Sequence, residues 1–159
     1  MYGQDIVRTR DNIVEEYGPD LEILLKFVPY LINSRNKMTQ KYYEGDGEKK
    51  IIPVPVYDST LLSFVKTAKT TKFINKNYPY TYRRYRIVST EDEIAAMEKG
   101  KITDLDLYRG ILSKYILEGQ TKGVMWTKGV TDGIYVTALT KLKMLFYDHS
   151  VEPGKINNV

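Results

Sequence analysis

Residues Thr103 to Gly119 read TDLDLYRGILSKYILEG, and the apolar side chains in this stretch recur every three or four positions. The recurring residues are Leu105, Tyr108, Ile111, Leu112, Tyr115 and Ile116. This spacing predicts an α-helix that begins at Thr103 or Asp104 and buries one face in a hydrophobic core. Gly119 is expected to end the helix, because glycine readily adopts the left-handed conformation that commonly closes one.

The same spacing predicts a helix near the start of the chain, from Gly18-Pro19-Asp20 to about Ile32. Its leucine-rich face contains Pro29, which removes a backbone donor and predicts a kink or break near Phe27–Val28. The residues before Gly18 form a polar lead-in with a short helix expected over 11–17.

Three more helices are predicted, at 60–72, at 90–99 and at about 128–147. Thr90 and Glu93 fit a capping box at the start of the 90–99 helix. The acidic run that begins at Glu91 is therefore expected to complement the helix dipole rather than to bind a metal ion.

A small β-hairpin is expected between the first two long helices, with the turn Gly45-Asp46-Gly47 joining residues 38–44 to 48–52. The segment 51–57 contains two prolines, which favour an extended or edge conformation. The predicted fold is mainly α (α+β minor): a single compact domain of about five helices with this hairpin. Residues 1–18 are the lead-in, 19–148 the globular domain and 149–159 a loose tail.

The composition excludes several classes of protein. A chain of 159 residues fits one domain with a substantial core. It contains no cysteine, so disulfides, thiol catalysis and thiolate metal sites are absent. Its apolar runs are too short to span a membrane, and no secretory signal is visible at the N-terminus. We therefore expect a cytoplasmic protein without a membrane partner.

The positive charge is concentrated in one internal segment. Residues 59–90 contain no Asp or Glu but seven of the 24 Lys and Arg residues, which leaves 17 basic against 20 acidic residues elsewhere. The whole net charge of +4 therefore comes from this segment. A fold places such a segment on a definite patch of its surface.

The segment ends in the cluster YPYTYRRYR, which spans Tyr78 to Arg86. It predicts either a packed corner between two helices or an anion-binding surface for nucleic acid, since Arg binds phosphate and Tyr stacks on bases. The candidate residues of that surface are Lys66, Lys69, Lys72, Lys76, Tyr82, Arg83, Arg84, Tyr85 and Arg86. The lysines overlap the apolar side of Leu62 and Val65, where their stems could lie along the rim of the core. This overlap favours the packed corner.

A second candidate is the loop from Gly119 to Gly129, where Lys122, Gly123 and Lys128 could hold a phosphate before the last helix. The simpler interpretation is favoured: the glycines end a helix and form a turn, and Trp126 anchors two helices in the core.

Nothing in the sequence indicates catalysis. The single histidine, His149, lies beside the expected loose tail, which is a poor place for a precisely held base. We predict no catalytic residues, no metal ion and no cofactor. The preferred function is a non-catalytic binding module, with a protein or a nucleic acid as equally favoured partners and a homo-oligomer also allowed. The alternatives are a nucleic-acid-associated protein that uses the basic cluster, and an enzyme based on convergent carboxylates.

Two stretches resemble a known family. They are the run from Tyr82 to Ile87 and the run GILSKYILEGQTKGVMW from Gly110 to Trp126, which is followed by Gly133-Ile134-Tyr135. They resemble a family of small bacterial proteins classed as a domain of unknown function. The similarity covers roughly residues 21–146. It implies a single compact domain and carries no activity or site residue.

Overall fold

The helix predicted from the TDLDLYRGILSKYILEG stretch lies at the centre of the fold. The structure, a computed structural model, describes residues 10–39 and 59–147. Helix α7 (Leu105–Glu118) buries every residue of its predicted apolar face and contacts α4, α5, α6, α8 and α9. Burial of these large side chains is the main stabilising contribution to such a core.

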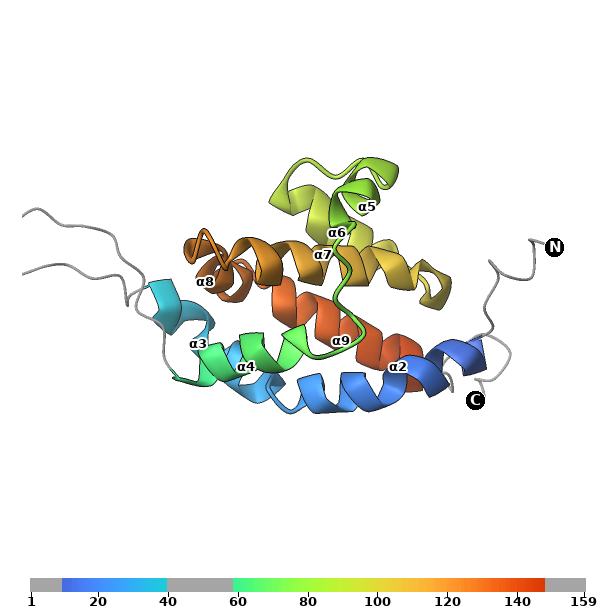
Figure 1. The fold of residues 1–159 in the computed structure, drawn as a ribbon, viewed down its shortest axis with the longest axis horizontal. Helices are drawn as coiled ribbons and strands as arrows, with labels where there is room; N and C mark the ends of the chain where they lie inside the picture. The colour runs from blue at the N-terminus through green and yellow to red at the C-terminus, as the bar shows by residue number, and fades with distance from the viewer. Residues whose placement is uncertain (1–9, 40–58, 148–159) are drawn as a thin grey trace, which may run out of the picture.

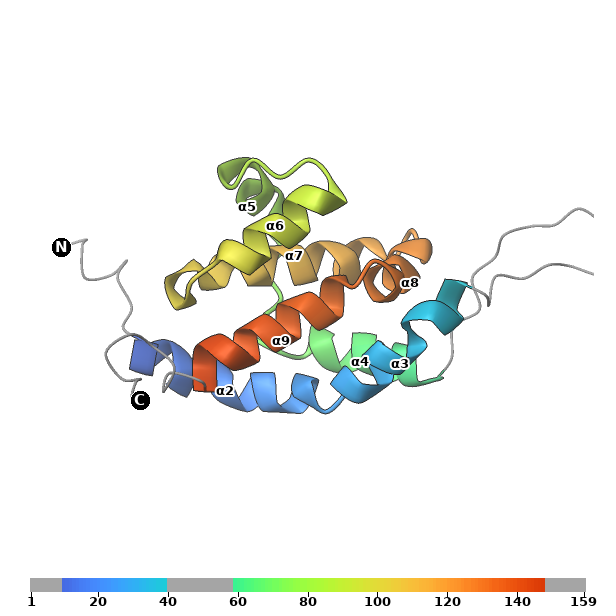
Figure 2. The same cartoon turned by 180° about the vertical axis from the view of Figure 1, so that it is seen from behind.

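The helices form three tiers around α7 (Figures 1 and 2). Helices α2 (Arg10–Leu25), α3 (Val28–Thr39) and α4 (Ser59–Lys69) form one side. Helices α7, α8 (Val124–Thr131) and α9 (Ile134–Tyr147) form the middle, and α5 (Tyr78–Arg84) and α6 (Thr90–Lys99) cover the other side. A short 3-10 helix, η1 (Ile102–Asp104), precedes α7.

The mainly helical prediction is confirmed, but the number of helices is not. Residues 10–39 and 59–147 form eight α-helices instead of about five, and these two ranges contain no strand. The predicted hairpin at 38–52 and the extended segment at 51–57 fall almost entirely outside the described residues.

The helix boundary predicted at Gly18-Pro19 is wrong, because α2 runs through both residues. Ile13, Tyr17 and Leu21 lie on one buried face and join the core, so the second half of the predicted lead-in belongs to the domain. A proline inside a helix costs about 3 kcal/mol. The burial of this face, much of it against α9, outweighs that cost.

The break near Phe27–Val28 is confirmed. Helix α2 ends at Leu25 and α3 begins at Val28, so Pro29 falls in the first turn of α3. Backbone N–H groups in a first turn have no acceptor within the helix, so a proline, which lacks this group, is tolerated there. The next helix, α4, ends three residues earlier than the predicted 60–72. The Thr71 hydroxyl donates to the carbonyl oxygen of Ala68 at 2.7 Å and closes the last turn.

The capping box predicted from Thr90 and Glu93 is also wrong. Ser89 is the N-cap of α6, and its hydroxyl accepts a hydrogen bond from the backbone N–H of Asp92 at 3.1 Å. Glu93 is then free of a capping role, and its side chain turns into the core, where the residue is only 3% exposed. The helix ends before Gly100, as predicted.

The last predicted helix is divided into α8 and α9 at Gly133. Gly133 has a φ of +76°, the left-handed conformation that glycine adopts without strain. The division turns Tyr135 so that its ring fills the core beside Phe64, with the ring centroids 4.9 Å apart.

Gly119 follows α7, as predicted, but for a different reason. Its φ is −65°, so it is not the left-handed glycine that the pattern suggested. A Cβ at this position would lie 2.0 Å from the indole ring of Trp126, whose N–H donates to the carbonyl oxygen of Ile116 at 2.9 Å. Gly119 is therefore needed because the Trp126 ring packs directly on its backbone, which agrees with the predicted anchoring role of that tryptophan.

Candidate anion-binding surface

The seven basic side chains of residues 59–90 are all exposed. Lys66 and Lys69 lie on α4, and Arg83 and Arg84 lie on α5, which Arg86 follows. Lys72 and Lys76 lie on the connection between these two helices, residues 70–77. Figure 1 shows the connection running from α4, in the lower tier, across the face turned to the viewer to α5, in the upper tier. Among the described residues, none of the seven forms an ion pair. We call these seven residues the basic strip.

Three of the four tyrosines of the cluster face the other way. The hydroxyl groups of Tyr78, Tyr82 and Tyr85 each donate a hydrogen bond to a carboxylate of the domain. The acceptors are Glu118 at 3.0 Å, Glu93 at 2.6 Å and Asp104 at 2.9 Å, respectively. The cluster is therefore both a packed corner and a charged surface: these three tyrosines anchor α5, and the arginines are exposed to solvent.

The environment of these hydroxyl groups keeps them protonated. Burial, with Asp104 as the second cause, raises the pKa of Tyr85 to about 12. Burial and then Glu93 raise the pKa of Tyr82 well above its usual range. Each tyrosine thus remains a hydrogen-bond donor and occupies a carboxylate that would otherwise be available to a neighbouring arginine.

Arg86 occupies a position that favours glycine. Its φ is +58°, the one described non-glycine residue in the left-handed region. The N–H of Arg86 donates to the carbonyl oxygen of Arg83 at 3.2 Å, and the N–H of Ile87 donates to that of Tyr82 at 2.9 Å. This is the Schellman motif, and Arg86 is at its C′ position. The strain of a side chain there is not offset by packing, because Arg86 is exposed.

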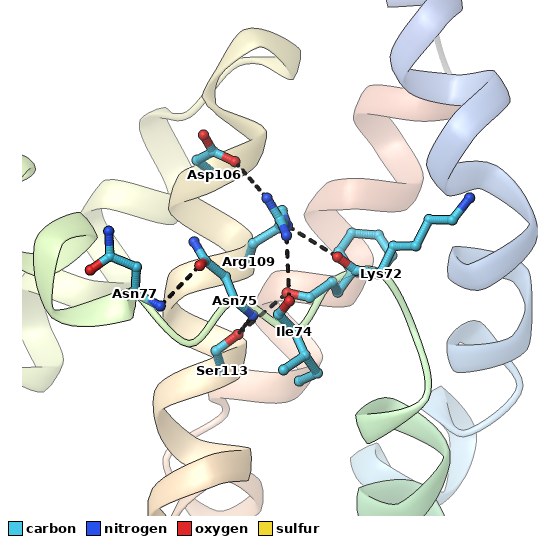
Figure 3. A network of polar contacts seen from close by, with 8 residues as sticks. Lys72, Ile74, Asn75, Asn77, Asp106, Arg109 and Ser113 are labelled. Carbon is cyan, nitrogen blue, oxygen red and sulfur yellow. Dashed lines mark hydrogen bonds and ion pairs between the residues drawn. The ribbon is translucent and has the colours of Figure 1, made fainter.

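The connection that carries Lys72 and Lys76 is fastened to α7 (Figure 3). The Arg109 guanidinium donates to the carbonyl oxygens of Lys72 at 3.2 Å and Ile74 at 3.4 Å. The hydroxyl of Ser113 accepts from the N–H of Asn75 at 2.7 Å. These bonds hold the backbone of the strip against the core, so the strip has a defined position.

The other end of the strip borders an apolar hollow. Lys66 and Lys69 line a hollow of about 520 Å³ together with Leu62, Val65 and Trp126. The two lysine stems therefore lie beside apolar surface, as the overlap in the sequence predicted.

A pocket of about 390 Å³ brings the two predicted sites together. Tyr82 of the cluster and both lysines of the phosphate loop, Lys122 and Lys128, line it. Gly123 is not among its lining residues. The sequence interpretation missed three other members, Glu93, Lys114 and Glu118. The four-residue spacing of Lys114, Glu118 and Lys122 was a signal for one of its walls, since it places them on the same face of α7 and its extension.

Two carboxylates that line one pocket form the arrangement that a carboxylate-based enzyme would need. Here each is engaged by tyrosine: Glu93 accepts from Tyr82 and from Tyr115, both at 2.6 Å, and Glu118 accepts from Tyr78. The tyrosine hydroxyls occupy the carboxylate oxygens that a proton transfer would use. The pocket therefore suits binding better than proton transfer.

Within residues 10–39 and 59–147, no three His, Asp or Glu side chains converge as a metal site would require. No helix of the described part is long and apolar enough to cross a membrane.

Comparison with known proteins adds no relative: no family model, curated protein or solved structure matches the chain. The resemblance to the family of small bacterial proteins therefore stays a prediction.

Proposed function

We propose that this protein is a non-catalytic binding module that contacts the phosphate backbone of nucleic acid through the basic strip. The observation that carries the proposal is that the arginines and most tyrosines of the Tyr78–Arg86 cluster face in opposite directions. Its arginines are exposed and form no ion pair among the described residues, while its tyrosines occupy the nearby carboxylates. The strip therefore keeps its charge available for an anionic partner.

Backbone contact is favoured over base stacking. The hydroxyl groups of Tyr82 and Tyr85 are held by the domain, and both residues are only partly exposed. Tyr80 is the exposed tyrosine of the cluster, at 52%. With little aromatic surface to read bases, affinity should come from phosphate contacts and should depend weakly on sequence and strongly on salt.

The test is fluorescence anisotropy with short mixed-sequence DNA and RNA, single- and double-stranded, between about 50 and 200 mM salt. The triple variant R83A/R84A/R86A should weaken binding and reduce the slope of log K against log salt by about three, because each arginine is expected to neutralise about one phosphate. Its melting temperature should stay close to that of the unmodified protein, because all three side chains are exposed.

The matched control removes the same charge elsewhere. K26A/K99A/K143A replaces three exposed lysines outside the strip, in the turn after α2, on α6 and on α9, and should leave most of the affinity and the salt slope intact. The absence of binding at low salt would refute the proposal and would favour the protein partner. An equal loss of affinity in the control variant would show that net charge alone, and not the strip, attracts nucleic acid.

A further inference from the structure

We propose that the pocket between the start of α6 and the end of α7 binds a small organic oxyanion: a carboxylate or phosphate group on a compact apolar or aromatic body. The site is distinct from the basic strip, and the proposal stands independently of nucleic-acid binding. Its volume of about 390 Å³ lies within the usual range for small-molecule sites.

The cations of the pocket differ in how far they are already neutralised. The Nζ atom of Lys128 lies 2.5 Å from the Asp132 carboxylate and 3.2 Å from the Thr90 hydroxyl. The Nζ atom of Lys114 lies 3.7 Å from Glu118 and 5.1 Å from the centre of the Tyr82 ring. Lys122 has no ion pair among the described residues. Lys122, assisted by Lys114, is thus the group that an oxyanion would meet.

The carboxylates of the pocket are engaged by donors of the protein. Glu93 is buried and directs its two oxygen atoms to the hydroxyl groups of Tyr82 and Tyr115. Glu118 directs one oxygen to Tyr78 and the other toward Lys114. Donors of the protein therefore occupy the carboxylate oxygens, and the bonds also hold the Tyr82 and Tyr115 rings as rigid walls.

The remaining wall is apolar and would cover the organic part of the ligand. It consists of Ile87, Val88 and Met125. Val88 is 91% exposed, which is exceptional for a large apolar side chain of this fold, and it precedes Ser89 and Thr90, which also line the pocket. An apolar edge next to hydroxyl donors and lysines matches a ligand with an oxyanion at one end and a hydrocarbon or ring at the other.

Three probes separate these contributions: phenyl phosphate, benzoate and benzyl alcohol, titrated into ¹⁵N-labelled protein and followed by NMR. We expect saturable binding of at least one of the two anions at concentrations up to about 10 mM, with shifts at residues 87–90 and 114–122. Benzyl alcohol should bind at least about tenfold more weakly, because it lacks the charge. The two anions together tell whether the site prefers phosphate or carboxylate.

Two variants at exposed positions test the roles of the residues. Lys122→Ala should weaken binding of the preferred anion about tenfold, whereas Lys143→Ala, on α9 and outside the lining of the pocket, should not change it. Val88→Ser should weaken binding of the aromatic anion but not of inorganic phosphate. R83A/R84A/R86A should leave binding of the anion unchanged, which separates this proposal from the nucleic-acid one.

The proposal is overturned if neither anion saturates, if benzyl alcohol binds as tightly as the anions, or if Lys122→Ala binds as the unmodified protein does. Shifts confined to residues 66–86 would equally refute it, since they would place the anion on the basic strip.

Discussion

Replacing Arg86 with glycine should raise stability and weaken nucleic-acid binding at the same time. A side chain held in the left-handed conformation, as Arg86 is at a φ of +58°, costs about 1 to 2 kcal/mol. Glycine relieves this strain but loses about 0.5 to 1 kcal/mol more backbone entropy on folding. The net gain centres on about 0.75 kcal/mol, or about 2 to 3 °C in melting temperature for a domain of this size.

The binding half of this prediction follows from the charge. Removing the one phosphate interaction that the proposal assigns to Arg86 should reduce the slope of log K against log salt by about one. Arg86→Ala is the matched control, because alanine removes the same charge but keeps a Cβ in the strained conformation. It should therefore bind as weakly as Arg86→Gly without the gain in stability.

Thermal unfolding followed by circular dichroism, together with anisotropy titrations over a range of salt, measures both effects. A lower melting temperature for Arg86→Gly would show that the arginine side chain stabilises the end of α5, contrary to its exposure. Unchanged binding in both variants would remove Arg86 from the interface.

The remaining predictions concern the core that supports the site. Gly119→Ala should destabilise the protein by more than about 2 kcal/mol, because its Cβ would lie 2.0 Å from the Trp126 indole. Gly18→Ala, in the interior of α2, should stabilise the protein by about 0.5 to 1 kcal/mol, because its Cβ would lie 3.7 Å from the nearest atom, the Tyr147 hydroxyl oxygen. Thermal unfolding of both variants checks the contrast. Glu93→Gln should lower the free energy of unfolding, measured with urea, by about 1 to 3 kcal/mol. The amide keeps one acceptor oxygen, but its NH2 group would face one of the two tyrosine hydroxyls with a donor instead of an acceptor. The free energy of unfolding should fall as pH rises above about 10. The unfolded chain releases tyrosine protons there, while the folded state retains them, as the pKa of Tyr85 at about 12 indicates. Urea midpoints between about pH 8 and pH 11 measure the loss, and constant midpoints would contradict it.

Much of the helical architecture could be predicted from the sequence. The face of α7 was found completely, because a helical repeat of apolar residues is a local property. The break before Val28 and the end of α6 at Gly100 were found for the same reason, since proline and glycine act on their own backbone. The positive charge of the basic strip could also be predicted, because charged residues are counted directly from the sequence.

Contacts between distant segments account for the errors. Helix α2 continues through Pro19 because its buried face packs on a helix more than a hundred residues away in sequence. Gly119 looked like a helix terminator, but the ring of Trp126 makes it necessary. Glu93 fitted a capping pattern in the sequence, but Ser89 is the N-cap in the structure. The Glu93 carboxylate instead accepts hydrogen bonds from two tyrosines, one on α5 and one on α7.

The sequence by itself determined a mainly helical chain whose net positive charge lies in residues 59–90. The tertiary structure alone decided the direction in which the Tyr78–Arg86 cluster faces. Tyrosine and arginine are both amphipathic, so neither type dictates which of them turns inward. The positions of Glu93, Asp104 and Glu118 around α5 made that choice, because each buried or half-buried carboxylate requires a donor, and a tyrosine reaches it from the helix.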